Sequence, residues 1–185
     1  MRKPITAIAL ATAATALSAG TAIAAPASAP APAADHLRLH SWTVLNEHGP
    51  GPNPGERLTA WVDARTVDGR TRGHAVVQHE FIGTGTARVE FDIDCLTADA
   101  GGAVTVTGPV GTATVTPVNG PATTGRAGWH PETGLTFYPA DASGEHRVGW
   151  AGADFLHPDA PARATRCTPV PAGLWVIEGR TAVHR

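Results

Sequence analysis

The sequence predicts an all-β fold, either an antiparallel β-sandwich or a closed β-barrel of about eight or nine short strands with one disulfide. Three observations support this class. Apolar and polar residues alternate with a period of two in many short segments, whereas no segment sustains a helical period. Turn sequences rich in glycine and proline separate these segments. The chain begins with a segment predicted to be an export signal and contains two cysteines, a combination typical of a disulfide.

Residues 1–24 are predicted to be a secretory signal peptide. Arg2 and Lys3 precede an apolar run from about residue 5 to residue 19. The run is followed by Ala22-Ile23-Ala24, which has the small-residue pattern of a signal-peptidase cleavage site. We therefore expect the mature protein to be secreted into the extracellular space.

Residues 25–35 are expected to form a disordered tail, because their proline and alanine residues cannot bury a core. The remaining residues, 36–185, are expected to form a single all-β domain, since a chain of this length buries a substantial core. No later run approaches the roughly 18 apolar residues that a membrane-spanning helix needs. The mature chain is therefore expected to have no transmembrane segment.

The predicted strands can be placed by their alternation. The clearest is Ala87–Leu96, in which apolar side chains share one face and charged side chains share the other, as in a half-buried antiparallel strand. Turn sequences such as Asp68-Gly69 and Asn119-Gly120-Pro121 fall between the strands. The other predicted strands are 36–45, 57–65, 73–82, 103–107, 112–116, 134–138, 145–150 and 173–184.

The segments 73–82 and 86–95 are predicted to form a hairpin around the loop Gly83–Gly85. A three-residue loop keeps apolar residues opposite one another, whereas a two-residue loop would mix the two faces. Val89, Phe91 and Ile93 should then be buried, and Asp92 and Asp94 should be exposed. This register pairs Phe81 with Ala87, Val77 with Phe91, Glu80 with Arg88 and His74 with Asp94.

Cys95 and Cys167 are both in the mature part of a chain predicted to be exported, so we expect them to form a disulfide. The bridge would close a loop of about 70 residues, which the chain-entropy model associates with roughly 4 kcal/mol of stabilisation. A nucleophilic role for either thiol is the less favoured interpretation.

No catalytic, metal or cofactor site is predicted. His79-Glu80 resembles the start of a zinc-protease motif, but that motif requires histidine at position 83, where the chain has Gly83. Glu90, Asp92 and Asp94 alternate along one strand, so a solvated face is favoured over a calcium site or a pair of glycosidase carboxyl groups. Ser143 lies near His146 in sequence, but its neighbours have turn composition.

The tryptophans offer the best candidates for ligand contact. Five are present, and most should fill the core because several alternate with aliphatic residues. Trp129 is the expected exception, since Gly128-Trp129-His130-Pro131 has the composition of a loop. An exposed tryptophan can stack on a sugar or an apolar ligand. Trp129 is therefore the predicted ligand contact.

The charge composition argues against nucleic acid as a partner. The net charge is −2, 16% of the residues are charged, and the arginines are scattered along the sequence. The expected partner is instead an unknown small ligand or a component of the cell envelope.

Three segments resemble a known group of proteins. RVEFDIDCLTADAGGAVTVTG (88–108) combines a charged alternating strand ending in Asp-Cys-Leu with a turn and a Val/Thr strand, and HRVGWAG (146–152) and GLWVIEGRTAV (173–183) follow. Over about 57–185 the chain is similar to small secreted all-β proteins of unknown function from actinobacteria. It departs from their pattern in 108–131 and has only a loose equivalent, 141–144, of an Asp/Gly-rich motif. The resemblance implies an actinobacterial source but names no activity and no functional residue.

The predicted function is a secreted, non-catalytic β domain that binds a small ligand or an envelope partner. Two alternatives are an extracellular hydrolase whose site is built from distant residues and a structural envelope-associated protein. A deep polar pocket would favour the hydrolase and an apolar barrel mouth would favour a binder. A filled core with a flat surface would favour the structural role.

Overall fold

The computed structural model describes residues 36–154 and 157–185, in which ten strands and no helix are found. The predicted all-β class is confirmed, and all strand pairings are antiparallel. The predicted signal peptide (1–24) and tail (25–35) lie outside the described residues. The strands are β1 His36–Asn46, β2 Glu56–Val67, β3 Arg70–Phe81, β4 Gly85–Ile93, β5 Cys95–Ala98, β6 Val104–Pro117, β7 Thr123–Thr124, β8 Glu132–Phe137, β9 Arg147–Ala151 and β10 Leu174–His184.

The observed strands differ from the predicted ones in three places, of which only the short strand β7 raises the count to ten. The predicted strands 103–107 and 112–116 are two parts of the single long strand β6, and the predicted strand 87–96 is divided into β4 and β5. The two-residue strand β7 has too short a sequence to show alternation. In the described part of the chain, no helix is long and apolar enough to cross a membrane.

All ten strands belong to one sheet that returns to its own start. The hydrogen-bonded order is β4-β3-β2-β1-β10-β9-β8-β6, and β6 also pairs with β4. β6 has both neighbours because its first part, 104–109, pairs with β8, whereas 110–117 pairs with β4. Gly108 lies at this change of partner, where a Cβ atom would overlap the backbone carbonyl of Asp92. A glycine is therefore required for the two strands to approach.

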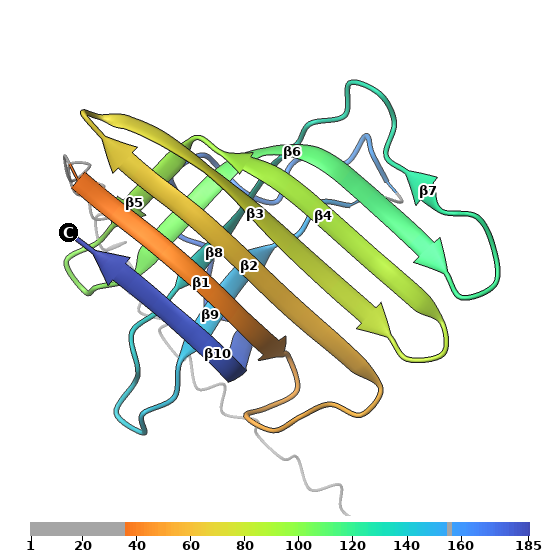
Figure 1. Cartoon of the computed structure of the whole chain (residues 1–185), viewed down its shortest axis with the longest axis horizontal. Coiled ribbons are helices and arrows are strands. Elements are labelled where there is room, and N and C mark those ends of the chain that lie inside the picture. Colours follow the sequence, from red (N-terminus) through yellow and green to blue (C-terminus); the bar gives the residue numbers. More distant parts are fainter. Residues whose placement is uncertain (1–35, 155–156) are drawn as a thin grey trace, which may run out of the picture.

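Figure 1 shows the sheet as two layers, with β1 to β4 and most of β10 in front and β8, β9 and part of β6 behind. Apolar side chains from both layers fill the space between them. The largest fully buried ones include Leu37, Leu39, Val62, Phe91, Val106 and Leu135. The interior is thus a packed core.

The β3–β4 hairpin is present, and its buried and exposed faces are the predicted ones. β3 and β4 pair antiparallel, Phe91 and Ile93 are buried, and Asp92 and Asp94 are exposed. Val89 is partly buried against a second small cluster around Trp129. Strand alternation alone was therefore sufficient to assign the two faces.

The predicted register of this hairpin is wrong. Phe81 pairs with Gly85, so the loop is 82–84, and Arg88 lies opposite Gln78 instead of the predicted Glu80. His74 likewise lies opposite Asp92 instead of Asp94. Gly85 belongs to β4 because β6 passes so close that a Cβ atom would overlap the carbonyl of Thr116. Both the close approach of β6 and the φ of +155° at this position therefore favour glycine.

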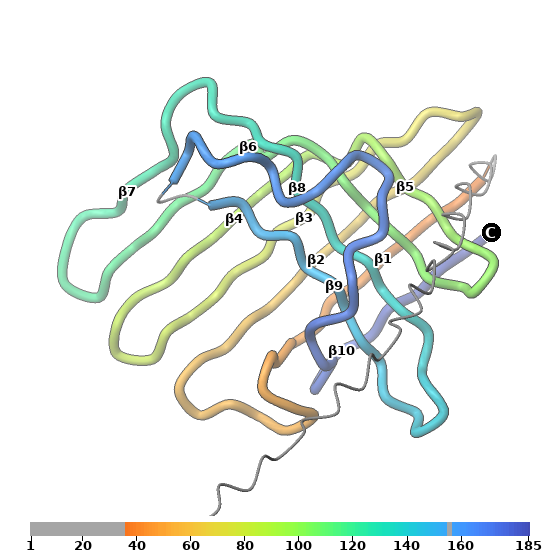
Figure 2. Tube along the Cα trace, turned by 180° about the vertical axis from the view of Figure 1, so that it is seen from behind, coloured from red at the N-terminus to blue at the C-terminus, as the bar shows by residue number. Residues whose placement is uncertain are grey.

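The predicted disulfide between Cys95 and Cys167 is present, with the two Cα atoms 5.6 Å apart. It fixes the loop before β10, which Figure 2 shows running over the rear layer. The backbone N–H of Cys167 donates to Thr107 Oγ1 at 3.0 Å. Arg166 adds a second tether, because its Nε donates to the carboxylate of Asp94 at 3.2 Å.

The end of this loop covers part of the outer surface of the rear layer. The backbone N–H of Val170 donates to Thr136 Oγ1 at 2.8 Å, and the hydroxyl of Tyr138 donates to the Val170 carbonyl at 2.7 Å. A Cβ atom on Gly149 of β9 would overlap that carbonyl, so the loop packs directly on the strand backbone. We call residues 166–173 the covering segment. The front layer has no equivalent cover among the described residues.

The double variant Cys95→Ser with Cys167→Ser should lower the free energy of unfolding by about 2 to 5 kcal/mol, because the bridge closes a long loop. The loss should appear in urea unfolding followed by tryptophan fluorescence. Hydrogen exchange should also become faster in the covering segment. A variant that unfolds within a degree or two of the parent on heating would show that the bridge does not stabilise the fold.

Candidate functional site

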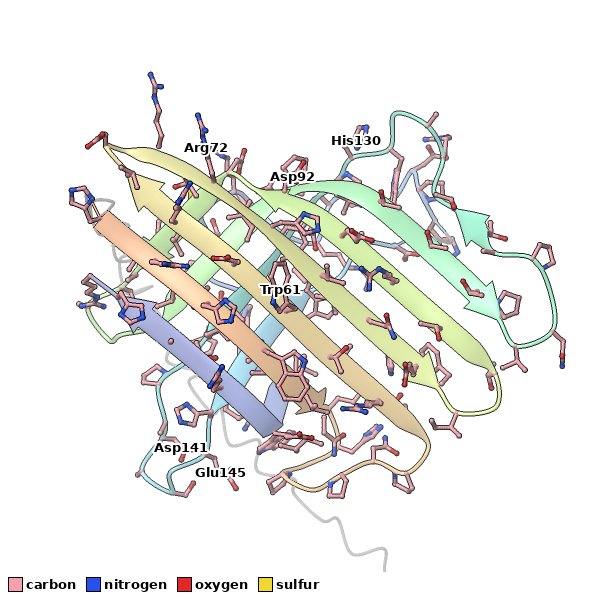
Figure 3. The ribbon with its side chains drawn as sticks, viewed as in Figure 1. Trp61, Arg72, Asp92, His130, Asp141 and Glu145 are labelled. Carbon is pink, nitrogen blue, oxygen red and sulfur yellow. A yellow bond between two sulfur atoms is a disulfide. The ribbon has the colours of Figure 1, made fainter. Side chains whose placement is uncertain are left out.

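Two tryptophans lie side by side on the outer surface of the front layer. Trp42 of β1 is directly opposite Trp61 of β2, and the two residues are 38% and 36% exposed. Figure 3 shows Trp61 near the middle of this surface, which we call the front face. The expectation that most tryptophans fill the core does not hold for this pair. They alternate in phase with polar residues, and this phase places them outside.

Neighbouring rings hold Trp61 in place. His40 meets its ring edge to face with centroids 6.5 Å apart, and His74 lies on another side at 6.3 Å. Beside the two tryptophans is an open hollow of about 390 Å³ that is also lined by Gln78 and Arg88. The front face therefore has a shallow apolar platform with polar groups around it.

A network of charged side chains borders the platform on β3 and β4. Arg88 Nε donates to Glu90 Oε1 at 2.9 Å, and the other carboxylate oxygen of Glu90 lies 3.3 Å from His74 Nε2. The second ring nitrogen of His74 lies 3.3 Å from Asp92 Oδ1. The network joins neighbouring strands and limits the freedom of these side chains.

The hydrogen bond from Arg88 lowers the pKa of Glu90 below its ordinary value of 4.5, although partial burial opposes the shift. The carboxyl group is therefore ionised at neutral pH. A glycosidase needs one carboxyl group that stays protonated to act as an acid. Glu90 cannot supply that proton at neutral pH, so it does not support the hydrolase alternative.

Trp129, the predicted ligand contact, is buried. It is 9% exposed and packs with Val110 and Ala113. Its indole N–H donates to the carbonyl of Pro158 at 3.0 Å, which explains how a tryptophan in a loop sequence is held inside. The expectation that Trp129 is the exposed tryptophan is wrong. A role for it in ligand contact stays an untested prediction.

The other sequence candidates take up local structural roles. Ser143 lies in a turn, as expected, and its hydroxyl donates to Asp141 Oδ1 at 2.6 Å. This bond is the main cause of the lowered pKa of Asp141. Asp94 binds Arg166, and Asp92 interacts with His74. Arg88 bonds to Glu90 and Gln78, so it does not form the predicted pair with Glu80.

One group of side chains has potential metal ligands that the sequence analysis did not single out. Glu47, His48 and Glu56 each place a ligand atom within 4.8 Å of the others. His79, on a strand as expected, bonds to the second carboxylate oxygen of Glu56 at 2.7 Å. Glu47 and His48 are exposed, and exposed groups of this kind are common without an ion. We assign no metal to them.

No family model, curated protein or solved structure in the comparisons matches this chain. The front face must therefore be interpreted from its own chemistry.

Replacement of Glu90 by Gln should reduce the dependence of stability on pH in acid. The lowered pKa of Glu90 means that its ionised form stabilises the fold above pH 4.5, and this contribution is lost as the pH falls through the pKa of the folded state. Urea unfolding measured from about pH 5 to pH 3 should show a smaller loss of stability in the variant than in the parent.

The matched control is Glu178→Gln, which removes the same charge from an exposed residue of β10. It should keep more of the parental pH dependence than Glu90→Gln does. Equal acid profiles for the parent and Glu90→Gln would contradict the proposed effect of Arg88.

Proposed function

We propose that this chain is a secreted, non-catalytic β domain whose front face binds a carbohydrate chain of the cell envelope. The observation that carries the proposal is the pair Trp42 and Trp61, opposite each other and exposed in the middle of the front layer. Such exposure leaves large apolar rings in water, which binding to a ligand would relieve.

The chemistry around the pair favours a sugar. Aromatic faces can pack on the apolar C–H faces of sugar rings, while nearby polar side chains bond to hydroxyl groups. Asp63, two residues after Trp61 on β2, supplies acceptors, and His40 lies two residues before Trp42 on β1. His74 and Gln78 are each two residues from Val76, which pairs with Trp61. The platform therefore combines the two kinds of contact that a carbohydrate requires.

The shape of the molecule favours a polymer over a small enclosed ligand. The interior is filled by side chains, and the hollow beside the tryptophans is open to solvent. An extended chain can lie across such a surface and make several weak contacts at once. The filled core also fits the structural envelope role, which is the second candidate function.

Secretion is part of the proposal. The Cys95–Cys167 bridge is compatible with an oxidising, extracellular environment. The predicted signal peptide supplies the route, and N-terminal sequencing of protein from culture medium would test it. A mature chain beginning near residue 25 is the expected result.

Trp42→Ala and Trp61→Ala should each weaken polysaccharide binding about tenfold, equivalent to about 1.4 kcal/mol of lost stacking. Affinity electrophoresis in gels that contain soluble neutral polysaccharides, including hydroxyethyl cellulose, mannan and arabinogalactan, would measure the effect. Pull-down on peptidoglycan and chitin would extend the panel to insoluble polymers.

Phe81→Ala is the matched control, because Phe81 is 40% exposed but lies at the end of β3. It should bind as the parent does. Parental binding by both tryptophan variants would reject the platform. Absence of binding by the folded parent to every polymer in these panels and in the acidic panel below would favour the structural role.

A further inference from the structure

Three arginines form a row across the front layer near the end at which β1 begins. Arg38 of β1 is directly opposite Arg65 of β2, and Arg65 is directly opposite Arg72 of β3. Arg70 lies at the start of β3, and all four side chains are exposed. Figure 3 shows Arg72 near the end of the layer, away from Trp61. We call the three aligned arginines and Arg70 together the arginine row.

No member of the arginine row forms a salt bridge in the described part of the chain, although Asp63 lies beside it on β2. The salt bridges of arginines in the described residues involve Arg88, Arg126, Arg163 and Arg166, and none includes a member of the row. Like charges directly opposite each other on neighbouring strands destabilise a sheet. The row therefore imposes a cost on the fold that an acidic ligand would offset.

Two surface hollows lie among these side chains. One, of about 380 Å³, is lined by Arg65, Val67, Arg70 and Arg72. The other, of about 340 Å³, is lined by residues that include Arg38, Asp63, Arg65 and Arg72. Guanidinium groups bind carboxylate, sulfate and phosphate oxygens with paired hydrogen bonds. The hollows thus combine space for an anionic group with donors suited to it.

We propose that the arginine row binds the acidic groups of an anionic polysaccharide whose sugar rings stack on Trp42 and Trp61. This inference rests on the proposed glycan-binding function and specifies its substrate class. The acidic group is a carboxylate, a sulfate or a phosphate that the polymer carries.

The two parts of the site lie on the same strands. Trp42 and Arg38 are four residues apart on β1, and Trp61 and Arg65 are four residues apart on β2. At about 3.3 Å per residue, each separation is roughly 13 Å along the strand. A polymer lying along β1 and β2 reaches both the platform and the row, whereas a single sugar does not.

The residues between the two parts favour a polysaccharide over nucleic acid or a lipid surface. The cross-strand set His40, Asp63, His74 and Asp92 separates the tryptophans from the arginines. Its carboxylates accept hydrogen bonds from hydroxyl groups, in which sugars are rich, and they repel a continuous phosphate backbone. Trp42 and Trp61 lie within β1 and β2, away from the strand ends. The exposed Phe81 and Ile82 at the β3–β4 turn lie at the opposite end of β3 from Arg70 and Arg72, so the arginine row is not combined with that apolar tip.

The test compares two polymers with the same backbone. Carboxymethyl cellulose carries carboxylates, whereas hydroxyethyl cellulose is neutral. The full mature chain should bind the acidic polymer at least tenfold more tightly in low salt, and added NaCl should reduce this preference because it screens the charges. Alginate and a sulfated glycan extend the test to other acidic groups.

Two sets of variants separate the parts of the site. Arg65→Gln with Arg72→Gln should remove most of the preference for carboxymethyl cellulose and leave binding to hydroxyethyl cellulose unchanged. Arg126→Gln with Arg163→Gln removes the same charge from loop residues that bond to Asp159 and Asp154, so it should keep the preference. Circular dichroism and thermal melting confirm that each variant is folded.

The outcomes distinguish this inference from the proposed function. Weaker binding by the tryptophan variants, together with an unchanged acidic preference in the variant Arg65→Gln with Arg72→Gln, would overturn the arginine inference alone. Tryptophan variants that bind both polymers like the parent would reject the proposed function. Equal or tighter binding of polyphosphate, a single-stranded oligonucleotide or anionic phospholipid vesicles would overturn the assignment to a polysaccharide.

Discussion

The register between β1, β2 and β3 is the constraint on which the front face depends. Side chains alternate across a strand, so a shift of one residue would turn Trp61 inward and expose Ala60 or Val62. The apolar set on the inner face therefore fixes the outer set. Packing of Val62 and Leu39 in the core is what brings Trp42 opposite Trp61 and Arg38 opposite Arg65. Stability and surface chemistry are two results of one alignment.

The fold class and the disulfide could be predicted because neither requires knowledge of which strands are neighbours. Alternation is visible in each strand alone, and two cysteines allow a single intramolecular pairing. The exposure of Trp61 was also predictable in principle, since it shares its phase with Arg57, Asp63 and Arg65. The general tendency of tryptophan to be buried led to the opposite expectation. For Trp129 the opposite error arose, because a loop sequence does not reveal the Pro158 carbonyl that binds its indole.

The site itself could not be read from the sequence. The arginines appear scattered because they are separated along the chain, and only the pairing of β1 with β2 and of β2 with β3 aligns them. Residues 47–55, which connect β1 and β2, form a long loop, and a loop of this length does not determine how the two strands pair. The β3–β4 hairpin shows a related problem, because the environment of Gly85 is set by β6, which pairs with β4 but is separated from it in sequence. Contacts between separate strands decide such details.

The path of the sheet has a consequence for association. A strand at the edge of an open sheet offers unpaired backbone groups to which another chain can add. Eight strands of this protein form a path from β4 through β10 to β6 and back, and in the described chain only the short strands β5 and β7 lie off it. The path is weakest between β9 and β10, where only Leu174 and Trp175 of β10 pair with β9. Residues 177–184 of β10 therefore leave one strand edge to which a second chain can add.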